Sequence, residues 1–151
     1  MTLSFDSNVL IYAADRGAGT RHDRASLLVE SALRLRRGLL TLQALAEFYS
    51  VSTRKLQARR EDVLKYLAGL RTALPIYPAA EPDLDAAVVA EQRHGLSFWD
   101  ALLWATADRA GVRWLVTEDF QDGRVIGGVT FVDPFNPAND RLLERELPPP
   151  A

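Results

Sequence analysis

The chain contains no cysteine and little lysine, histidine or methionine. Its 151 residues include no Cys, one Met and two His, and only two of its 18 basic residues are Lys. Without cysteine there can be no disulfide, no thiolate metal site and no cysteine nucleophile. The absence suits a reducing compartment, so we expect a cytoplasmic protein. His22 and His94 each fall at the end of a predicted helix, so we expect surface or capping residues rather than metal ligands.

Long hydrophobic runs are also absent. No apolar stretch approaches the roughly 18 residues of a membrane span, and the amino terminus lacks a basic segment followed by an apolar signal core. We therefore expect no membrane association. The nucleotide-binding patterns GxxxxGKS/T and GxGxxG do not occur. Length and composition predict one globular domain over residues 1–151, with a short proline-rich tail at 147–151.

The charges are unevenly distributed along the chain. The net charge is −2, but residues 1–71 carry 12 basic against 7 acidic side chains, whereas residues 72–151 carry 6 against 13. Sixteen of the basic residues are Arg, whose guanidinium can bind phosphate through two parallel hydrogen bonds. For each of two basic clusters, phosphate binding and a merely solvated helix face both stay open: Arg34, Arg36 and Arg37, and Arg54, Lys55, Arg59 and Arg60.

Hydrophobic periodicity and turn residues predict short strands alternating with helices. Strands are expected at 2–5, 39–42, 74–78, 113–116 and 129–132. Helical segments are expected at 9–13, 22–37, 43–55, 61–71, 82–94 and 98–110, with Gly38, Gly95 and Gly111 ending three of them. This alternation indicates an α/β fold with a mainly parallel central sheet flanked by helices.

Four acidic residues far apart in the sequence are expected at one edge of this sheet. Asp6 follows the first strand, Asp119 lies just beyond the strand at 113–116, and Glu47 and Asp100 lie early in two helices. In open α/β sheets the carboxyl ends of the strands and the amino ends of the helices meet at the ligand-binding edge. Each acid alone has an ordinary structural explanation, but a shared edge for all four indicates a site.

Asp100 shows the two interpretations most clearly. It lies in an apolar helix, "SFWDALLWATAD", that we expect to be buried, and a buried carboxylate is costly unless a partner compensates it. Ser97 and Asp100 have the spacing of a capping box, in which the acid would stabilise the start of the helix. The alternative is that Asp100 ligates a metal ion together with the other acids.

Clustered carboxylates repel one another and require raised pKa values or a bound cation. Ligand sets made only of oxygen select hard ions such as Mg²⁺ or Mn²⁺, which keep several waters for substrate phosphates. Such an ion can activate water and neutralise the charge of a phosphate during its transfer. The four acids therefore favour metal-dependent chemistry on a phosphate ester.

At this point the residues resemble a known family. The segments "FDSNVLIYA", "LAEFY", "SFWDALLWATA" and "LVTEDFQDG", in that order, together with the closing "DPFNP", resemble the motifs of PIN-domain nucleases, and among these the VapC-type toxins of toxin–antitoxin pairs. The resemblance covers nearly the whole chain. It implies a PIN-like three-layer α/β sandwich, an RNA substrate, a cognate antitoxin protein and a homodimer.

The resemblance also implies roles for individual residues. Asp6, Glu47, Asp100 and Asp119 would form an acidic quartet that binds Mg²⁺, or Mn²⁺ in its place, for RNA cleavage. The supporting residues would be Ser7, Asn8, Thr117 and Glu118, while the role of Asp122 stays open. Because phosphate charge dominates affinity for RNA, we expect backbone contacts from Arg54, Lys55, Arg59 and Arg60.

Other functions are weighed against this hypothesis. The acid cluster would also suit a cation-binding regulatory protein without nuclease activity, such as a receiver domain. A receiver needs a lysine late in the chain, and both lysines here lie in the first half. A nuclease acting on DNA is not distinguished by the acids. The tryptophans Trp99, Trp104 and Trp114 are expected in the core rather than as platforms for stacking bases.

Overall fold

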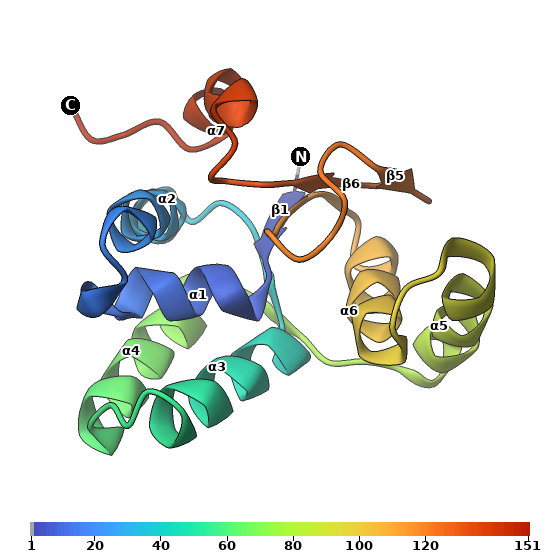
Figure 1. The fold of residues 1–151 in the computed structure, drawn as a ribbon, viewed down its shortest axis with the longest axis horizontal. Coiled ribbons are helices and arrows are strands. Elements are labelled where there is room, and N and C mark those ends of the chain that lie inside the picture. The colour runs from blue at the N-terminus through green and yellow to red at the C-terminus, as the bar shows by residue number, and fades with distance from the viewer. Residues whose placement is uncertain (1) are drawn as a thin grey trace.

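In the computed structural model, which describes residues 2–151, a four-stranded sheet lies between helices (Figure 1). Its order is β1-β4-β6-β5, where the strands span Thr2–Phe5 (β1), Val112–Val116 (β4), Val129–Val132 (β6) and Val125–Ile126 (β5). Strands β1, β4 and β6 are parallel, and β5 is antiparallel to β6. The predicted α/β fold with a mainly parallel central sheet is confirmed.

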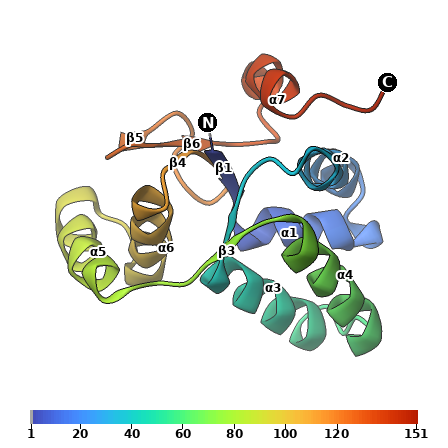
Figure 2. The ribbon, with the colours of Figure 1, turned by 180° about the vertical axis from the view of Figure 1, so that it is seen from behind.

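Helices cover both sides of the sheet. Within residues 2–151 there are seven α-helices: α1 (Ser7–Ala14), α2 (Thr20–Leu35), α3 (Leu42–Arg54), α4 (Arg60–Ala73), α5 (Glu81–His94), α6 (Phe98–Arg109) and α7 (Asp140–Glu146). Figures 1 and 2 show α1 to α4 on one side and α5 with α6 on the other. A separate parallel pair, β2 (Leu40–Thr41) and β3 (Ile76–Tyr77), leads into α3 and toward α5. No helix in the described part of the chain is long and apolar enough to cross a membrane.

The central strands are buried on both faces, as a parallel sheet between helices requires. Phe5, Leu115 and Phe131 are at most 1% exposed. Phe120, just after β4, stacks on Phe131 with ring centroids 4.4 Å apart. This packing fixes the ends of the strands, and therefore the positions of the residues that follow them.

The end of α2 differs from the prediction. The helix ends at Leu35, where Arg36 adopts a left-handed conformation with φ 51°, and does not continue to Gly38. Gly38 serves a different purpose, because a Cβ atom there would lie 2.7 Å from the carbonyl oxygen of Leu3. The glycine therefore permits a close approach of the chain to β1.

Two elements were not predicted, β5 and α7. The short helix α7 buries Leu143, and Leu147 is buried just after it. Two residues of the first basic cluster hold this segment: Arg34 donates to the carbonyl of Pro148 at 2.7 Å, and Arg37 to that of Glu146 at 2.9 Å. This cluster therefore anchors the C-terminal segment, which a solvated helix face would not do.

Candidate active site

The carboxyl ends of β1 and β4 lie side by side. Phe5 pairs with Val116, and the N–H of Asp6 donates to the carbonyl of Val116 at 2.9 Å. The N–H of Thr117 donates in the same way to Val132 of β6. Asp6 and Thr117 therefore share one edge of the sheet, and Asp6 is also the N-cap of α1. Figure 1 shows α1 starting where β1 ends.

Asp6 is the most deeply buried acid of this edge, at 4% exposure. One carboxylate oxygen accepts the N–H of Ser7 at 2.7 Å and so caps α1, and the other accepts the hydroxyl of Thr117 at 2.8 Å. Burial raises the pKa of Asp6 to about 6, with the charges of Glu47 and Asp119 adding to the rise and the two hydrogen bonds opposing it. The fold holds this carboxylate without a full set of compensating partners.

Glu47 lies in the second turn of α3 and is oriented by two neighbours. The hydroxyl of Ser7 donates to its Oε2 at 2.8 Å, and the amide of Gln43 donates to its Oε1 at 2.9 Å. Ser7 thus contacts the carboxylates of both Asp6 and Glu47. Sequence reasoning missed Gln43, although its position one helical turn before Glu47 was the available signal.

Asp119 is exposed at the outer side of this edge. Its backbone N–H donates to the hydroxyl of Thr117 at 3.1 Å, and Thr117 itself is 1% exposed. Thr117 therefore links the backbone of Asp119 to the carboxylate of Asp6. The carboxylate of Asp119 is close enough to influence the pKa values of both Asp6 and Asp100.

Asp100 is half-buried in the first turn of α6. The helix is otherwise largely buried, as expected, with Ala101 and residues 103–107 in the interior. The hydroxyl of Ser97 accepts the N–H of Asp100 at 3.3 Å, so Ser97 does cap the helix. Burial raises the pKa of Asp100, the side chain of Ser97 opposes this, and the charges of Asp119 and Glu47 add to it. The helix start is capped, and its acid also faces the other acids.

The four acids suit a divalent cation. None of the five ion pairs found within residues 2–151 includes any of them, so no basic side chain neutralises them. No three acidic or histidine side chains of those residues form a ready-made metal cage. Mg²⁺ does not require one, because it is held through one or two carboxylates and keeps several waters. Nearby, both polar atoms of the Asn8 amide are buried without a partner among the described residues.

Glu118 has a different set of contacts from the four acids. Its carboxylate accepts hydrogen bonds from the hydroxyl of Tyr12 and the guanidinium of Arg21, and the latter is also an ion pair. The Arg21 guanidinium lies over the ring of Phe135, 4.4 Å from its centroid. Glu118 therefore ties the loop that carries Asp119 to α1 and α2, and its charge is already compensated.

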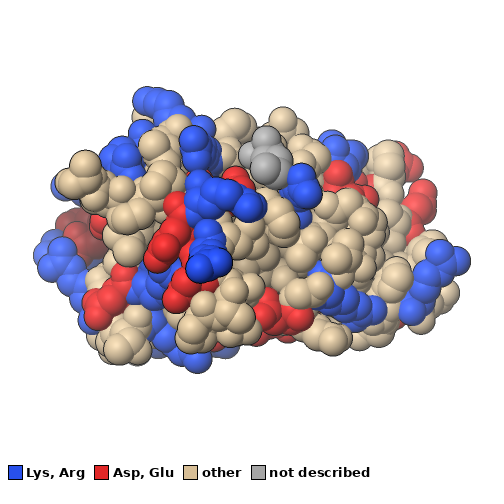
Figure 3. Space-filling model, turned by 90° about the horizontal axis from the view of Figure 1, so that it is seen from above, with Lys and Arg blue, Asp and Glu red and all other residues tan. Residues whose placement is uncertain are grey.

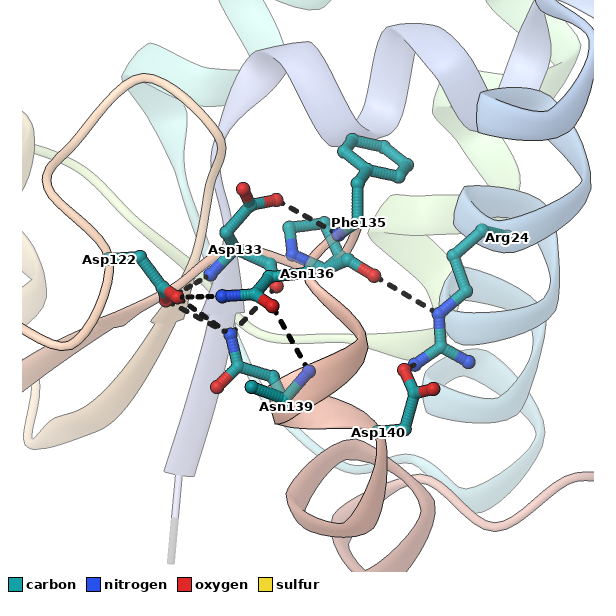
Figure 4. Close-up of polar contacts among 9 residues, drawn as sticks. Arg24, Asp122, Asp133, Phe135, Asn136, Asn139 and Asp140 are labelled. Carbon is teal, nitrogen blue, oxygen red and sulfur yellow. Dashed lines mark hydrogen bonds and ion pairs between the residues drawn. The ribbon is translucent and has the colours of Figure 1, made fainter.

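Asp122 lies outside the acid group and fastens two loops together (Figure 4). Its carboxylate accepts the N–H of Asp133 at 2.9 Å and the side-chain amides of Asn136 and Asn139 at 2.7 and 3.0 Å. Burial alone would raise the pKa of Asp122, but these hydrogen bonds hold it below its usual value. Asp122 therefore joins the loop that follows β4 to the loop that precedes α7.

The second basic cluster lies at the far end of α3 from Glu47. Arg54 and Lys55 end that helix, Arg59 and Arg60 begin α4, and all four are exposed. Arg54 donates to Ser50, and Arg59 pairs with Glu61. Glu47 and Arg54 are separated by about 10 Å along the helix axis, at 1.5 Å per residue. Figure 3 shows a different face, seen from above the view of Figure 1, on which both signs of charge are mixed.

The family model described as "PIN domain" matches residues 4–124. The fold is similar to the sarcin-ricin loop cleaving toxin VapC20 of Mycobacterium tuberculosis, with a TM-score of 0.65, 18% identity, and coverage of 78% of this chain and 90% of that one. A search of curated protein sequences gave no match.

Two further solved structures share the fold. A toxin–antitoxin complex from Klebsiella pneumoniae gives a TM-score of 0.62 and 22% identity, covering 89% of this chain and 98% of that one. VapBC2 of Rickettsia felis, bound to a DNA fragment from its promoter, gives a TM-score of 0.61 and 18% identity. The match covers 87% of this chain and 97% of that one. At these identities the likeness is one of fold, and it agrees with the expected PIN-like architecture.

Proposed function

Because the chain belongs to the PIN domain family, we propose that it is a divalent-metal-dependent endoribonuclease whose metal is held by Asp6, Glu47, Asp100 and Asp119. One observation carries the proposal: Glu47 and Asp119, from distant segments, lie close enough to Asp6 and Asp100 to raise the pKa values of both. None of the ion pairs found within residues 2–151 includes any of the four acids. Mg²⁺ is the expected ion, and Mn²⁺ can replace it.

The side chains around the acids prepare them for this role. When bound, the ion activates water and neutralises charge on the phosphate. Thr117 and the N–H of Ser7 keep Asp6 in one orientation, and the Ser7 hydroxyl and Gln43 do the same for Glu47. The exposed carboxylate of Asp119 lies where solvent and substrate can reach it. No protein nucleophile is needed.

We propose further that the protein is the toxin of a type II toxin–antitoxin pair. The fold likeness to a VapC toxin and to VapBC complexes supports this, and it supports a cognate antitoxin as partner. A homodimer and a cytoplasmic location belong to the same proposal. Arg54, Lys55, Arg59 and Arg60 are proposed to contact the RNA backbone, since all four are exposed and α3 leads to them from Glu47.

Cleavage of single-stranded RNA by the purified protein tests the activity. We expect cleavage with Mg²⁺ or Mn²⁺, none in chelator, and a loss of at least about a hundredfold for Asp6→Asn, since a metal supplies several kcal/mol to such a reaction. Asp122→Asn is the matched control, because it changes an acid outside the quartet, and it should retain activity.

Three results would count against the proposal. Undiminished cleavage by Asp6→Asn, with contaminating nuclease excluded, would remove the metal assignment. Cleavage that persists in chelator would do the same. Equal or faster cleavage of single-stranded DNA would replace the RNA substrate with DNA.

A further inference from the structure

Trp99 differs from the other two tryptophans. Trp104 is 8% exposed and its indole N–H donates to the carbonyl of Ile126 at 3.0 Å, and Trp114 is half-buried. Trp99 is 65% exposed, so the expectation that it belongs to the core is wrong. Large aromatic side chains left at the surface are enriched where a protein binds a partner.

The backbone of Trp99 is linked to the acid group through the side chain of Gln43. Its carbonyl accepts a hydrogen bond from the side-chain amide of Gln43 at 2.9 Å, and the same nitrogen donates to Glu47 at 2.9 Å. Asp100 is the next residue in the chain, about 3.8 Å away between Cα atoms. The first turn of α6 thus presents Asp100 and the ring of Trp99 together, and Gln43 of α3 links this turn to Glu47.

The indole ring is also held in place. The ring of Phe98 packs edge-on against it, with centroids 5.1 Å apart and planes at 77°. Phe98 itself is partly buried against the hydrophobic core. A ring fixed in this way loses little conformational freedom when a flat ligand stacks on it.

The surroundings favour a nucleobase over a protein surface. The interface between two proteins has an apolar core of many residues, whereas Trp99 combines one aromatic contact, Phe98, with the polar Ser97 and Asp100 on either side in the chain. The acids repel phosphates wherever a cation does not screen them, so binding near them needs a contact that does not depend on charge. Stacking on an aromatic ring is such a contact and accepts every base.

We propose that the indole of Trp99 stacks on one base of single-stranded RNA, beside the phosphate that the acids act on. The inference rests on the proposed function, because it concerns the substrate of the same site. It assigns Trp99 to substrate binding rather than to the chemical step. Since stacking tolerates all four bases, the nucleotide at this position should be bound with little preference for its identity.

Steady-state cleavage of a short single-stranded RNA tests the proposal. We expect Trp99→Ala to raise KM about 5- to 150-fold, which corresponds to 1–3 kcal/mol of base stacking at 1.36 kcal/mol per tenfold. The value of kcat should change little. Trp99→Phe keeps a stacking face and should stay near the parent, whereas Trp99→Leu keeps apolar area without the ring and should resemble Trp99→Ala. Val125→Ala, at a residue 62% exposed on β5, is the matched control and should leave KM unchanged.

An abasic nucleotide identifies the contact itself. Substrates with one abasic position each are compared between the parent and Trp99→Ala. At one position near the cleavage point, loss of the base should raise KM for the parent and have little further effect on Trp99→Ala. If Trp99 had only a structural role, the effects on KM of removing the base and of Trp99→Ala would be additive at every position.

The outcomes separate this inference from the activity. If the parent does not cut RNA, the proposed function fails first. If the parent cuts RNA with metal and Trp99→Ala leaves KM unchanged, the stacking proposal alone is overturned. The same holds if Trp99→Leu behaves as the parent does, or if Trp99→Ala changes KM only by dissociating a dimer in light scattering.

Discussion

Two buried aspartates near the starts of helices have opposite environments. Asp6 is 4% exposed and Asp83, in the first turn of α5, is 2% exposed. Asp83 forms an ion pair with Arg109 at 2.8 Å and accepts the N–H of Ala80 at 2.8 Å and the hydroxyl of Thr106 at 3.3 Å. Asp6 has two donors, Ser7 and Thr117, and faces two further acids.

The difference separates an acid whose charge the fold compensates from one whose charge it does not. Burial would raise the pKa of Asp83, but Arg109, Ala80 and Thr106 bring it below its usual value. Burial raises the pKa of Asp6 to about 6, and its acidic neighbours raise it too. Asp83 therefore stabilises the fold at neutral pH, whereas the ionised Asp6 destabilises it, and the proposed cation would offset this cost.

Removing Asp83 should have the largest effect on stability. Asp83→Ala loses a buried ion pair and two hydrogen bonds, which should cost about 2–4 kcal/mol and lower Tm by roughly 5–15 °C. Because the pKa of Asp83 is lowered in the fold, its contribution is present above about pH 4 and is lost as the pH falls. Thermal melts at pH 7.5 and pH 3.5 measure this, and the variant should differ less from the parent at the lower pH. An equal loss of Tm at both pH values would contradict the ion pair between Asp83 and Arg109.

Asp6→Asn should do the opposite in chelator. With a folded pKa of about 6 against 3.8 unfolded, the ionised Asp6 costs the fold about 3 kcal/mol above pH 6 and nothing well below pH 4. Part of the gain is offset because an amide is a poorer acceptor for Thr117. We expect a net stabilisation of about 1–2 kcal/mol at pH 7.5, shrinking toward pH 4.5. A lower Tm for Asp6→Asn at pH 7.5 would show that its charge is compensated after all.

Asp122→Asn should have a smaller effect. The carboxylate accepts three donors and an amide cannot satisfy all of them, but Asp122 is exposed and water replaces part of what is lost. We expect a loss of about 1 kcal/mol, or roughly 2–4 °C in Tm. The shift that Mg²⁺ gives to Tm should stay unchanged. A variant that loses this shift would place Asp122 in the metal site.

The smallest effect is expected from the basic cluster. Arg59→Ala combined with Arg60→Ala should leave Tm nearly unchanged, because both side chains are exposed. If they contact phosphates, the slope of log affinity for RNA against log salt should fall by about 1.4, or 0.7 for each contact. Fluorescence anisotropy at several salt concentrations measures the slope. An unchanged slope would return the cluster to a solvated surface.

The sequence predicted the sheet because short apolar runs bounded by turn residues are local signals, and it pointed to one edge because acids follow two of these strands. Asp6, Glu47, Asp100 and Asp119 are each placed by the element that carries them. The contacts that distinguish them depend on tertiary packing, such as Ser7 on Glu47, Arg21 on Glu118 and Asn136 on Asp122. The prediction that Trp99 lies in the core was wrong because the apolar composition of its helix indicated burial throughout. Its exposure depends on how the first turn of α6 packs, which the sequence does not show.

Four thermal melts test the central claim, that the acids form a site for a divalent cation. The parent and Asp100→Asn are each melted in chelator and with Mg²⁺ at a hundredfold excess over the dissociation constant. The parent should gain about 2.7 kcal/mol from the ion. Asp100→Asn should melt higher than the parent in chelator, because a repulsive charge is gone, and should lose most of the Mg²⁺ shift. If the variant instead melts lower in chelator and keeps the full shift, Asp100 is only part of a helix cap and the metal site is wrong.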